Sequence, residues 1–303
     1  MKAEDAEQGA FSSWAGMALV NLATLSWATN LNLARWIKDD IGPLTLTALR
    51  FTVASLIFGA LLSRAPEKER RYGKDFWLLL GMSLSGVVLF SPMIYWGLHY
   101  TTAANAALIN GLAPLFTVLW GFLLIQESLT PREIWGAVLA FLGVIVLLCK
   151  GSLSYLLGFK INPGDLLVLG AVALWGLYSV LGRRVMKKSG RSALSATALS
   201  AYLGLALLWA CAAWEMFILP AQLSLKLIAA VVYIGIAPTV IGYVAWNAGV
   251  RRLGAFGAMI FYNTLPLYGA SLGFFLLGEP LTPAHLAGGA LIIAGGIWAA
   301  RKT

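Results

Sequence analysis

The sequence GFLLIQESLTP at residues 121–131 returns as GFFLLGEPLTP at residues 273–283. Two glycines that follow recur as well, at Gly136 and Gly143 in the first copy and at Gly288 and Gly295 in the second. When residues 101–150 are shifted by 152 positions without a gap, 16 of the 50 positions are identical. Apolar composition alone would not align a glutamate, glycines and a Leu-Thr-Pro turn, so we interpret the pattern as an internal duplication.

The composition is that of a membrane protein rather than a soluble one. Of the 303 residues, 59% are hydrophobic and only 12% are charged, and the mean hydropathy is +0.79. The charges gather between apolar runs of about 20 residues, the length at which a helix spans a bilayer. These runs are too long and too continuously apolar for barrel strands, so an all-α polytopic fold is predicted. Ten transmembrane helices are expected, at residues 14–34, 44–63, 76–98, 101–125, 132–150, 163–182, 193–217, 224–250, 255–277 and 282–300.

The duplication extends upstream with a slightly different shift. Trp27 aligns with Trp175 when the sequence is shifted by 148 positions, so the first span resembles the sixth. The predicted units are therefore residues 1–152 with helices 1–5 and residues 153–303 with helices 6–10. Because five is odd, the second unit enters the membrane from the opposite face, which gives an inverted repeat. Such a pair can exchange conformations, and alternating access to a central site follows from the symmetry.

The distribution of lysine and arginine predicts the orientation. If the N-terminus is cytoplasmic, 16 of the 22 basic residues lie on that side, five lie on the other, and Arg50 lies inside the second span. The asymmetry favours cytoplasmic positions for both termini. The acidic start of the chain lacks the pattern of a signal peptide, so the first span is expected to remain as an anchor. A net charge of +9 that sits beside membrane spans does not indicate nucleic acid as a partner.

Polar and aromatic residues recur at matching positions of the two halves and form the candidate substrate site. In the third span, Ser91, Tyr95 and His99 share one helical face, and the counterparts of the first two are Tyr243 and Asn247. Amides are costly in hydrocarbon unless partnered, so these faces are expected to turn toward other helices or a wet cavity. The predicted substrate-binding residues are Trp27, Asn30, Ser91, Tyr95, His99, Asn110, Trp175, Tyr178, Tyr243, Trp246, Asn247, Tyr262 and Asn263. The alternative for each is interhelical hydrogen bonding or aromatic packing.

The remaining polar features are assigned structural roles. Arg50 lies close enough to the start of its span to be expected to reach the membrane interface by snorkelling. Cys149 and Cys211 lack metal or disulfide spacing, so no metal and no cofactor are predicted. Pro92, Pro114, Pro238 and Pro266 lie within spans, where they are expected to kink helices or free carbonyl groups. The glycines of spans 5 and 10 form a smooth stripe for close helix contact, within the chain or in a homodimer.

The repeated pattern, with Gly278-Glu279-Pro280-Leu281-Thr282-Pro283 before a glycine-rich last span and a basic tail, resembles the EamA-type branch of the drug/metabolite transporter superfamily. Both halves carry the resemblance, although the first has Gln126-Glu127-Ser128 where Gly-Glu-Pro is usual. Among bacterial members the chain is most similar to inner-membrane exporters of aromatic amino acids. The resemblance implies ten helices in two inverted five-helix repeats, a central substrate cavity and no nucleotide hydrolysis.

These observations together predict a secondary transporter or facilitator that moves small metabolites, most of all amino acids, across the bacterial inner membrane. The expected partners are the solute and membrane lipid. No P-loop is present, which disfavours an ATP-driven pump. Two histidines with scattered carboxylates do not form a catalytic cluster, so an intramembrane enzyme is not expected. A channel and the same fold with another cargo, such as a nucleoside, sugar phosphate or drug, are the alternatives. A phosphate cargo would require inward-facing Lys or Arg, which the sequence scarcely offers.

Overall fold

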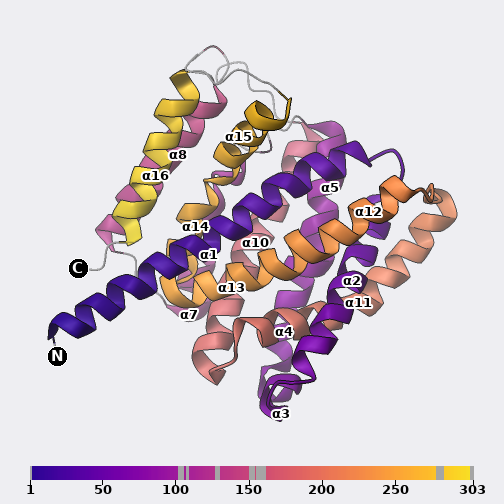
Figure 1. Cartoon of the computed structure of the whole chain (residues 1–303), viewed down its shortest axis with the longest axis horizontal. Helices are drawn as coiled ribbons and strands as arrows, with labels where there is room; N and C mark the ends of the chain where they lie inside the picture. The colour runs from indigo at the N-terminus through magenta and orange to yellow at the C-terminus, as the bar shows by residue number, and fades with distance from the viewer. Residues whose placement is uncertain are drawn as a thin grey trace.

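The computed structural model describes residues 2–101, 106, 109–126, 130–149, 154, 162–277 and 283–300. Within these ranges the side chains of residues 2–12, 31, 32, 35, 147, 148, 270, 273, 274, 276, 277 and 300 are left out of the description. The elements over the described residues are all helical (Figure 1): α1 (Lys2–Trp36), α2 (Pro43–Leu62), α3 (Glu67–Arg70), η1 (Gly73–Asp75), α4 (Phe76–Met82), η2 (Ser83–Leu89), α5 (Phe90–Tyr100), α7 (Ala113–Ile125), α8 (Pro131–Leu148), α10 (Pro163–Ser189), α11 (Ala193–Ile218), α12 (Leu225–Ile234), η3 (Gly235–Ile241), α13 (Gly242–Leu253), α14 (Ala255–Tyr262), α15 (Leu265–Leu277) and α16 (Pro283–Ala300).

The helices confirm the predicted all-α polytopic fold. Each of the ten expected spans contains a described helix, and five helical segments are long and apolar enough to cross a membrane. These are Pro43–Leu62, Glu67–Tyr100, Pro163–Ser189, Ala193–Ile218 and Leu225–Leu253. Residues 127–129 and 278–282, which include the repeated glutamate and part of each Leu-Thr-Pro turn, lie outside the described residues. So does the boundary at residue 152, which stays a prediction.

The two halves are antiparallel, as the odd number of spans predicts. Helices α8 and α16 lie side by side at one edge of the molecule (Figure 1), and the glycine stripe lies between them. A Cβ atom added to Gly143 would meet the carbonyl oxygen of Gly288 at 2.6 Å, and one added to Gly295 would meet that of Gly136 at 2.5 Å. These four glycines are two pairs related by the 152-residue shift. Corresponding helices therefore run past one another in opposite directions, in close backbone contact.

Irregular backbone also occurs at matching places. The π-helices η2 and η3 cover residues 83–89 and 235–241, which differ by 152 positions at both ends. Helix breaks at residues 111–112 and 263–264 show the same relation. Pro114 and Pro266 are the second residues of α7 and α15, so they begin new helices rather than kink continuous ones. Pro238 lies inside η3, where its missing N–H suits the altered hydrogen-bond ladder.

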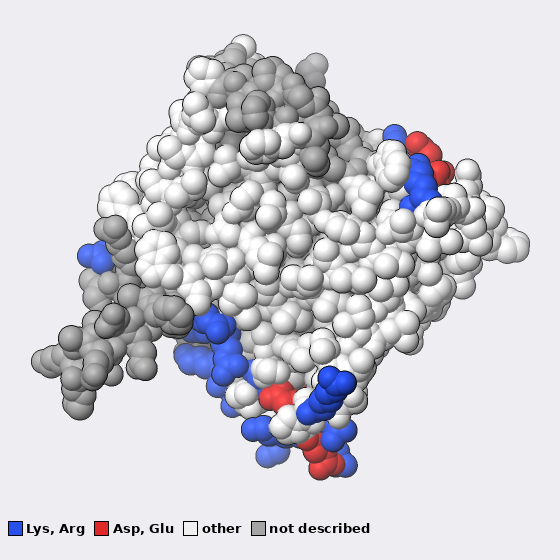
Figure 2. All heavy atoms as spheres, viewed as in Figure 1, with Lys and Arg blue, Asp and Glu red and all other residues white. Residues whose placement is uncertain are grey.

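The surface has the charge distribution of a membrane protein. Figure 2 shows a broad band without charged residues, with Lys and Arg gathered along one edge and a smaller charged group at the opposite one. Helix α1 begins and α16 ends on the side of the larger basic group (Figure 1). Large apolar side chains are exposed in the spans, among them Leu56, Phe122 and Trp135. Contact with lipid, rather than water, accounts for that exposure.

Candidate functional site

Residues that correspond by the repeat touch each other at the centre of the bundle. Trp27 in α1 and its counterpart Trp175 in α10 meet edge to face, with ring centroids 5.0 Å apart. Tyr262 in α14 donates a hydrogen bond of 3.3 Å to the amide oxygen of Asn110, which is its counterpart at the 152-residue shift. A side chain can contact its own symmetry mate only near the axis that relates the halves. The axis of the repeat therefore passes through this region.

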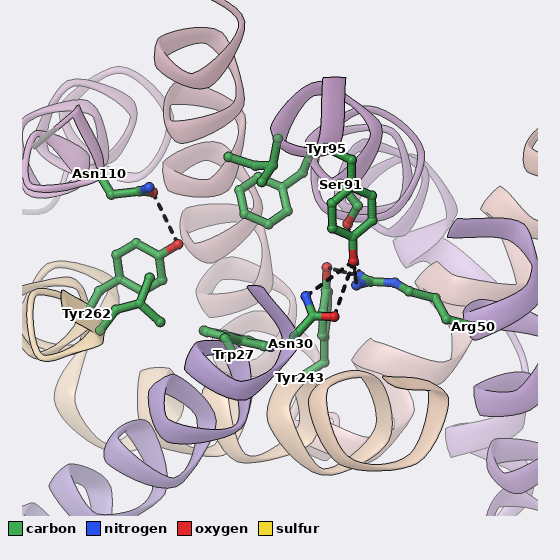
Figure 3. A pocket seen from close by; sticks show the side chains of 11 residues that line it. Trp27, Asn30, Arg50, Ser91, Tyr95, Asn110, Tyr243 and Tyr262 are labelled. Carbon is green, nitrogen blue, oxygen red and sulfur yellow. Dashed lines mark hydrogen bonds between the residues drawn. The ribbon is translucent and has the colours of Figure 1, made fainter. Parts of the chain in front are cut away.

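A cavity of about 50 Å³ lies beside these mate contacts (Figure 3). Its lining residues come from both halves of the chain: Trp27, Asn30, Arg50, Phe90, Ser91, Ile94, Tyr95, Asn110, Tyr243, Tyr262 and Leu265. The volume is enough for a few water molecules and is smaller than ligand sites of roughly 300 Å³ or more. Seven of the thirteen residues predicted from the sequence line it, so the matched polar faces do turn toward a shared central space.

Four of the predicted residues lie behind the cavity wall and form a buried layer. Trp175 stacks on Tyr178 with centroids 5.0 Å apart, and Trp246 lies 5.3 Å from Trp175. The indole N–H of Trp246 donates to Ser179, and the amide of Asn247 donates to Tyr178 and Thr197. All four side chains are fully buried. In this conformation Trp175, Tyr178, Trp246 and Asn247 support the cavity-lining rings instead of facing the open space.

Two further predicted residues lie elsewhere. Asn263 follows α14 at the helix break, is 2% exposed, and neither polar atom of its side chain has a partner among the described residues. His99 lies near the end of α5, where its Nδ1 is 2.9 Å from the carbonyl oxygen of Tyr95. It lines a second cavity of about 90 Å³, together with Lys38 and Tyr95. Tyr95 thus separates the two cavities and contributes to both.

The expectation that Arg50 snorkels to the interface is wrong. Its side chain is 3% exposed and points inward from α2, where it lines the central cavity (Figure 3). The guanidinium donates to Ser91 Oγ at 2.9 Å, to Tyr95 Oη at 3.0 Å and to Tyr243 Oη at 3.3 Å. The sequence places Arg50 near the start of a span but does not say which way the helix faces, and here the inward face carries it. An isolated charge inside an apolar span is the signal that could have identified it.

Each π-helix offers a backbone carbonyl to an aromatic side chain of the opposite half. The indole N–H of Trp27 donates to the carbonyl oxygen of Pro238 at 2.9 Å, and the hydroxyl of Tyr243 donates to that of Gly86 at 2.8 Å. Gly86 and Pro238 correspond at the 152-residue shift. The widened helical turns thus free carbonyl groups that fix the orientation of two cavity-lining rings.

At the basic end of the bundle an ion pair joins the halves. Arg191, just before α11, pairs with Asp75 at 2.6 Å and also donates to the carbonyl oxygens of Lys68, Arg71 and Tyr72. Both members of the pair are almost fully buried. The second cavity lies at the other end, beside the α1–α2 connection that carries Lys38. An ion pair also joins the halves at that end, where Lys226 lies 2.7 Å from Asp40, but its side chains are 35% and 23% exposed. The two ends therefore differ in how deeply the joining pair is buried.

The comparisons with known proteins agree with this architecture. The model of the EamA-like transporter family matches residues 14–149 and 162–300, once in each half. The chain is 28% identical over 283 residues to the uncharacterized transporter YyaM of Bacillus subtilis, which covers 91% of this chain and 90% of that protein. It is 27% identical over 234 residues to the aromatic amino acid exporter YddG of Ancylobacter novellus, with 76% and 77% coverage.

A solved crystal structure is similar over nearly the whole length. It superposes with a TM-score of 0.73 at 26% identity and covers 94% of this chain and 96% of its own. The two family matches, one on each half, together include most of the residues. The chain therefore belongs to the EamA-like transporter family.

Proposed function

We propose that this transporter is a secondary carrier that exports amino acids, including aromatic ones, across the bacterial inner membrane by alternating access. The observation that carries the proposal is the central cavity, which lies where the halves meet and is lined by rings and amides together. Rings such as Trp27 and Tyr262 can stack on an apolar or aromatic side chain, and Asn30 and Asn110 can bind polar groups. The name of the Ancylobacter novellus relative, an aromatic amino acid exporter, supports the same cargo class.

The asymmetry between the ends supports alternating access. In an inverted repeat, the contacts that close one end have counterparts that can close the other. Here the Asp75–Arg191 pair is almost fully buried, whereas the Asp40–Lys226 pair at the other end is partly exposed, and a cavity lies at that end beside Lys38 and His99. The central cavity is smaller than an amino acid, so substrate binding requires the lining side chains to move apart. The count of basic residues supports a cytoplasmic position for the Asp75–Arg191 end and for both termini.

A phosphate cargo is the second candidate, and one observation favours it. The sequence was expected to offer scarcely any inward-facing Lys or Arg, yet Arg50 lines the central cavity. A guanidinium suits phosphate as well as carboxylate, because its N–H groups can pair with two oxygens at once. The cargo class therefore needs a direct transport measurement.

Transport by the purified full chain in proteoliposomes would test the function. We expect saturable uptake of labelled aromatic amino acids, and accelerated exchange when unlabelled amino acid is present on the opposite side. The measurement is made with and without a pH gradient, using sugar phosphates and nucleosides as competing cargo. Protein-free liposomes serve as the control. Failure to move any amino acid, with uptake of a phosphorylated solute, would replace the proposed cargo, and uptake without saturation or counterflow would indicate a channel.

A further inference from the structure

Arg50 is a cation without an anion. Its guanidinium contacts three neutral hydroxyl groups, and no described carboxylate lies within 4 Å of it. Its Nε has no hydrogen-bond partner among the described residues, although the side chain is 97% buried. Arginine stays protonated inside proteins, so the charge persists there. A buried, unpaired charge costs several kcal/mol, and in a membrane span it marks a functional site by default.

The hydroxyl groups around Arg50 are oriented as acceptors. Tyr243 gives its hydrogen to the carbonyl oxygen of Gly86, so a lone pair remains for the guanidinium. Tyr95 is within 3.3 Å of the amide oxygen of Asn30 and accepts from Arg50 at 3.0 Å. The ring of Phe51 adds a cation–π contact at 4.8 Å. These groups hold the cation in place, but they supply only partial negative charge, so an anionic oxygen would bind the guanidinium more strongly.

The charge of the cavity limits what that anion can be. Arg50 is the only charged residue among those that line the central cavity in the described part of the chain. One guanidinium matches a monoanion, whereas a phosphate dianion would leave charge uncompensated in a low-dielectric site. The neighbouring cavity is lined by Lys38 and His99 and shares Tyr95 with the central one.

The repeat shows that the charge is not part of the shared scaffold. At a shift of 150 residues, α2 aligns with α11, and Arg50 corresponds to Ser200. Ser200 is fully buried, and its hydroxyl donates to the carbonyl oxygen of Thr197. The two helices pack against each other, so the fold accepts a small neutral residue at this position. Of these two corresponding positions only Arg50 carries a positive charge, so an anion can bind at the α2 position and not at the α11 position.

From these observations we infer that Arg50 binds the carboxylate of the transported solute, with the rings of Trp27 and Tyr262 receiving its apolar part. The inference rests on the proposed carrier function and deepens it. It assigns recognition to the acid group rather than to the amino group. Acids without an amine should therefore bind, whereas amides of the same amino acids should not.

Thermal stabilisation of the purified chain in detergent would measure that preference. The probes are phenylalanine, phenylalaninamide, 3-phenylpropanoate and glucose 6-phosphate, and the variants are R50Q and S200A. For the unmodified protein, we expect phenylalanine and 3-phenylpropanoate to bind at least about tenfold more tightly than the amide, as loss of a charge-assisted hydrogen bond predicts. R50Q should remove that discrimination, while S200A, which changes the corresponding residue without altering the cavity charge, should retain it.

A role for Arg50 in stability alone gives a different pattern. If the guanidinium served only to hold helices together, R50Q would lower the melting temperature of the ligand-free protein. Removal of an unpaired buried cation is instead expected to leave it unchanged or raise it. The inference is overturned if the unmodified protein binds neither carboxylate, if R50Q still prefers acid over amide, or if glucose 6-phosphate binds more tightly than both acids.

The two proposals can fail separately. Proteoliposomes that move amino acids with equal acid-over-amide preference in R50Q and unmodified protein would keep the carrier function and overturn the role of Arg50. If 3-phenylpropanoate binds in a way that depends on Arg50 but no amino acid is transported, the role of Arg50 is kept and the carrier function is overturned. Loss of phenylalanine transport together with loss of acid preference in R50Q supports both.

Discussion

Helices α2 and α11 are the same helix in two copies, and they differ where the cavity is. Their sequences align as PLTLTALR and ALSATALS from residues 43 and 193. The shared small and apolar residues let the two helices pack closely, and the last residue of each stretch is Arg50 in one and Ser200 in the other. The comparison indicates that symmetry is kept for packing and abandoned at the position that lines the central cavity.

The first turns of α2 and α11 also make matching contacts. Each begins beside a glutamate that lies at or beyond the end of the other helix. Glu215 accepts hydrogen bonds from the backbone N–H groups of Leu44 and Thr45 at the start of α2. Glu69 accepts from the backbone N–H and the hydroxyl of Ser192 at the start of α11. The arrangement requires antiparallel helices, because the start of each meets the end of its partner.

The largest expected effect on stability comes from removing one of these two glutamates. Glu215→Ala should lower the free energy of unfolding by about 3 kcal/mol, because two buried N–H groups lose a charged acceptor. Glu69→Ala should cost only about 1 kcal/mol, since α11 is also capped by Ser192 and held by Arg191. Gly42, at the N-cap of α2, provides no side-chain cap. Unfolding by sodium dodecyl sulfate in mixed micelles measures both, and equal losses would contradict the assigned difference.

A smaller effect is expected where the symmetry is closest. Gly143→Ala and Gly295→Ala should each cost about 2 kcal/mol, because the added methyl group meets rigid backbone of the facing helix. The contacts correspond in detail: a Cβ atom added to Gly143 would lie 2.8 Å from the backbone nitrogen of Ile292, and one added to Gly295 would lie 2.7 Å from that of Ala140. The expected result is therefore the same loss in both variants, measured in the same micelles.

Gly121 provides the matched control for these two substitutions. A Cβ atom added to it would meet nothing within 4 Å, so Gly121→Ala should leave stability unchanged or slightly raise it. Unequal losses at Gly143 and Gly295 would show that α8 and α16 do not contact each other symmetrically. A loss at Gly121 of the same size would indicate that helix contact is not the cause.

Much of the fold could be predicted from the sequence, because the repeat carries residues that apolar composition does not explain. The helical spans followed from the apolar runs, and the antiparallel halves from the odd number of spans in each copy of the repeat that Gly143 and Gly295 help to define. The π-helices could not be predicted, since their boundaries depend on how the ladder of backbone hydrogen bonds adjusts to packing. Pro114 and Pro266 do carry the signal of the two helix breaks, because proline favours the first turn of a helix.

The site was predicted less completely, for a physical reason. Helical periodicity tells which residues share a face, but the neighbouring helices decide whether that face meets space or other side chains. Trp27 lines the cavity, whereas its counterpart Trp175 is covered by other rings. Arg50 was assigned to the interface because the sequence shows its position near the start of a span but not which side of the helix faces the other helices.

The smallest effect concerns Trp27 and Trp175, which are counterparts with different hydrogen bonds. Trp27 donates to the carbonyl oxygen of Pro238, whereas the indole N–H of Trp175 has no partner among the described residues. The carbonyl group of Gly86, which corresponds to Pro238, accepts from Tyr243 instead. Trp→Phe removes the same ring atoms at both positions, and Trp175 is the more deeply buried of the two, so ring packing alone would make W175F the costlier variant and a larger cost for W27F points to its hydrogen bond. W27F should cost about 1 kcal/mol more than W175F in the micelle assay. A smaller cost for W27F than for W175F would mean that the bond to η3 adds nothing, and that Trp27 is held by ring packing alone, as Trp175 is.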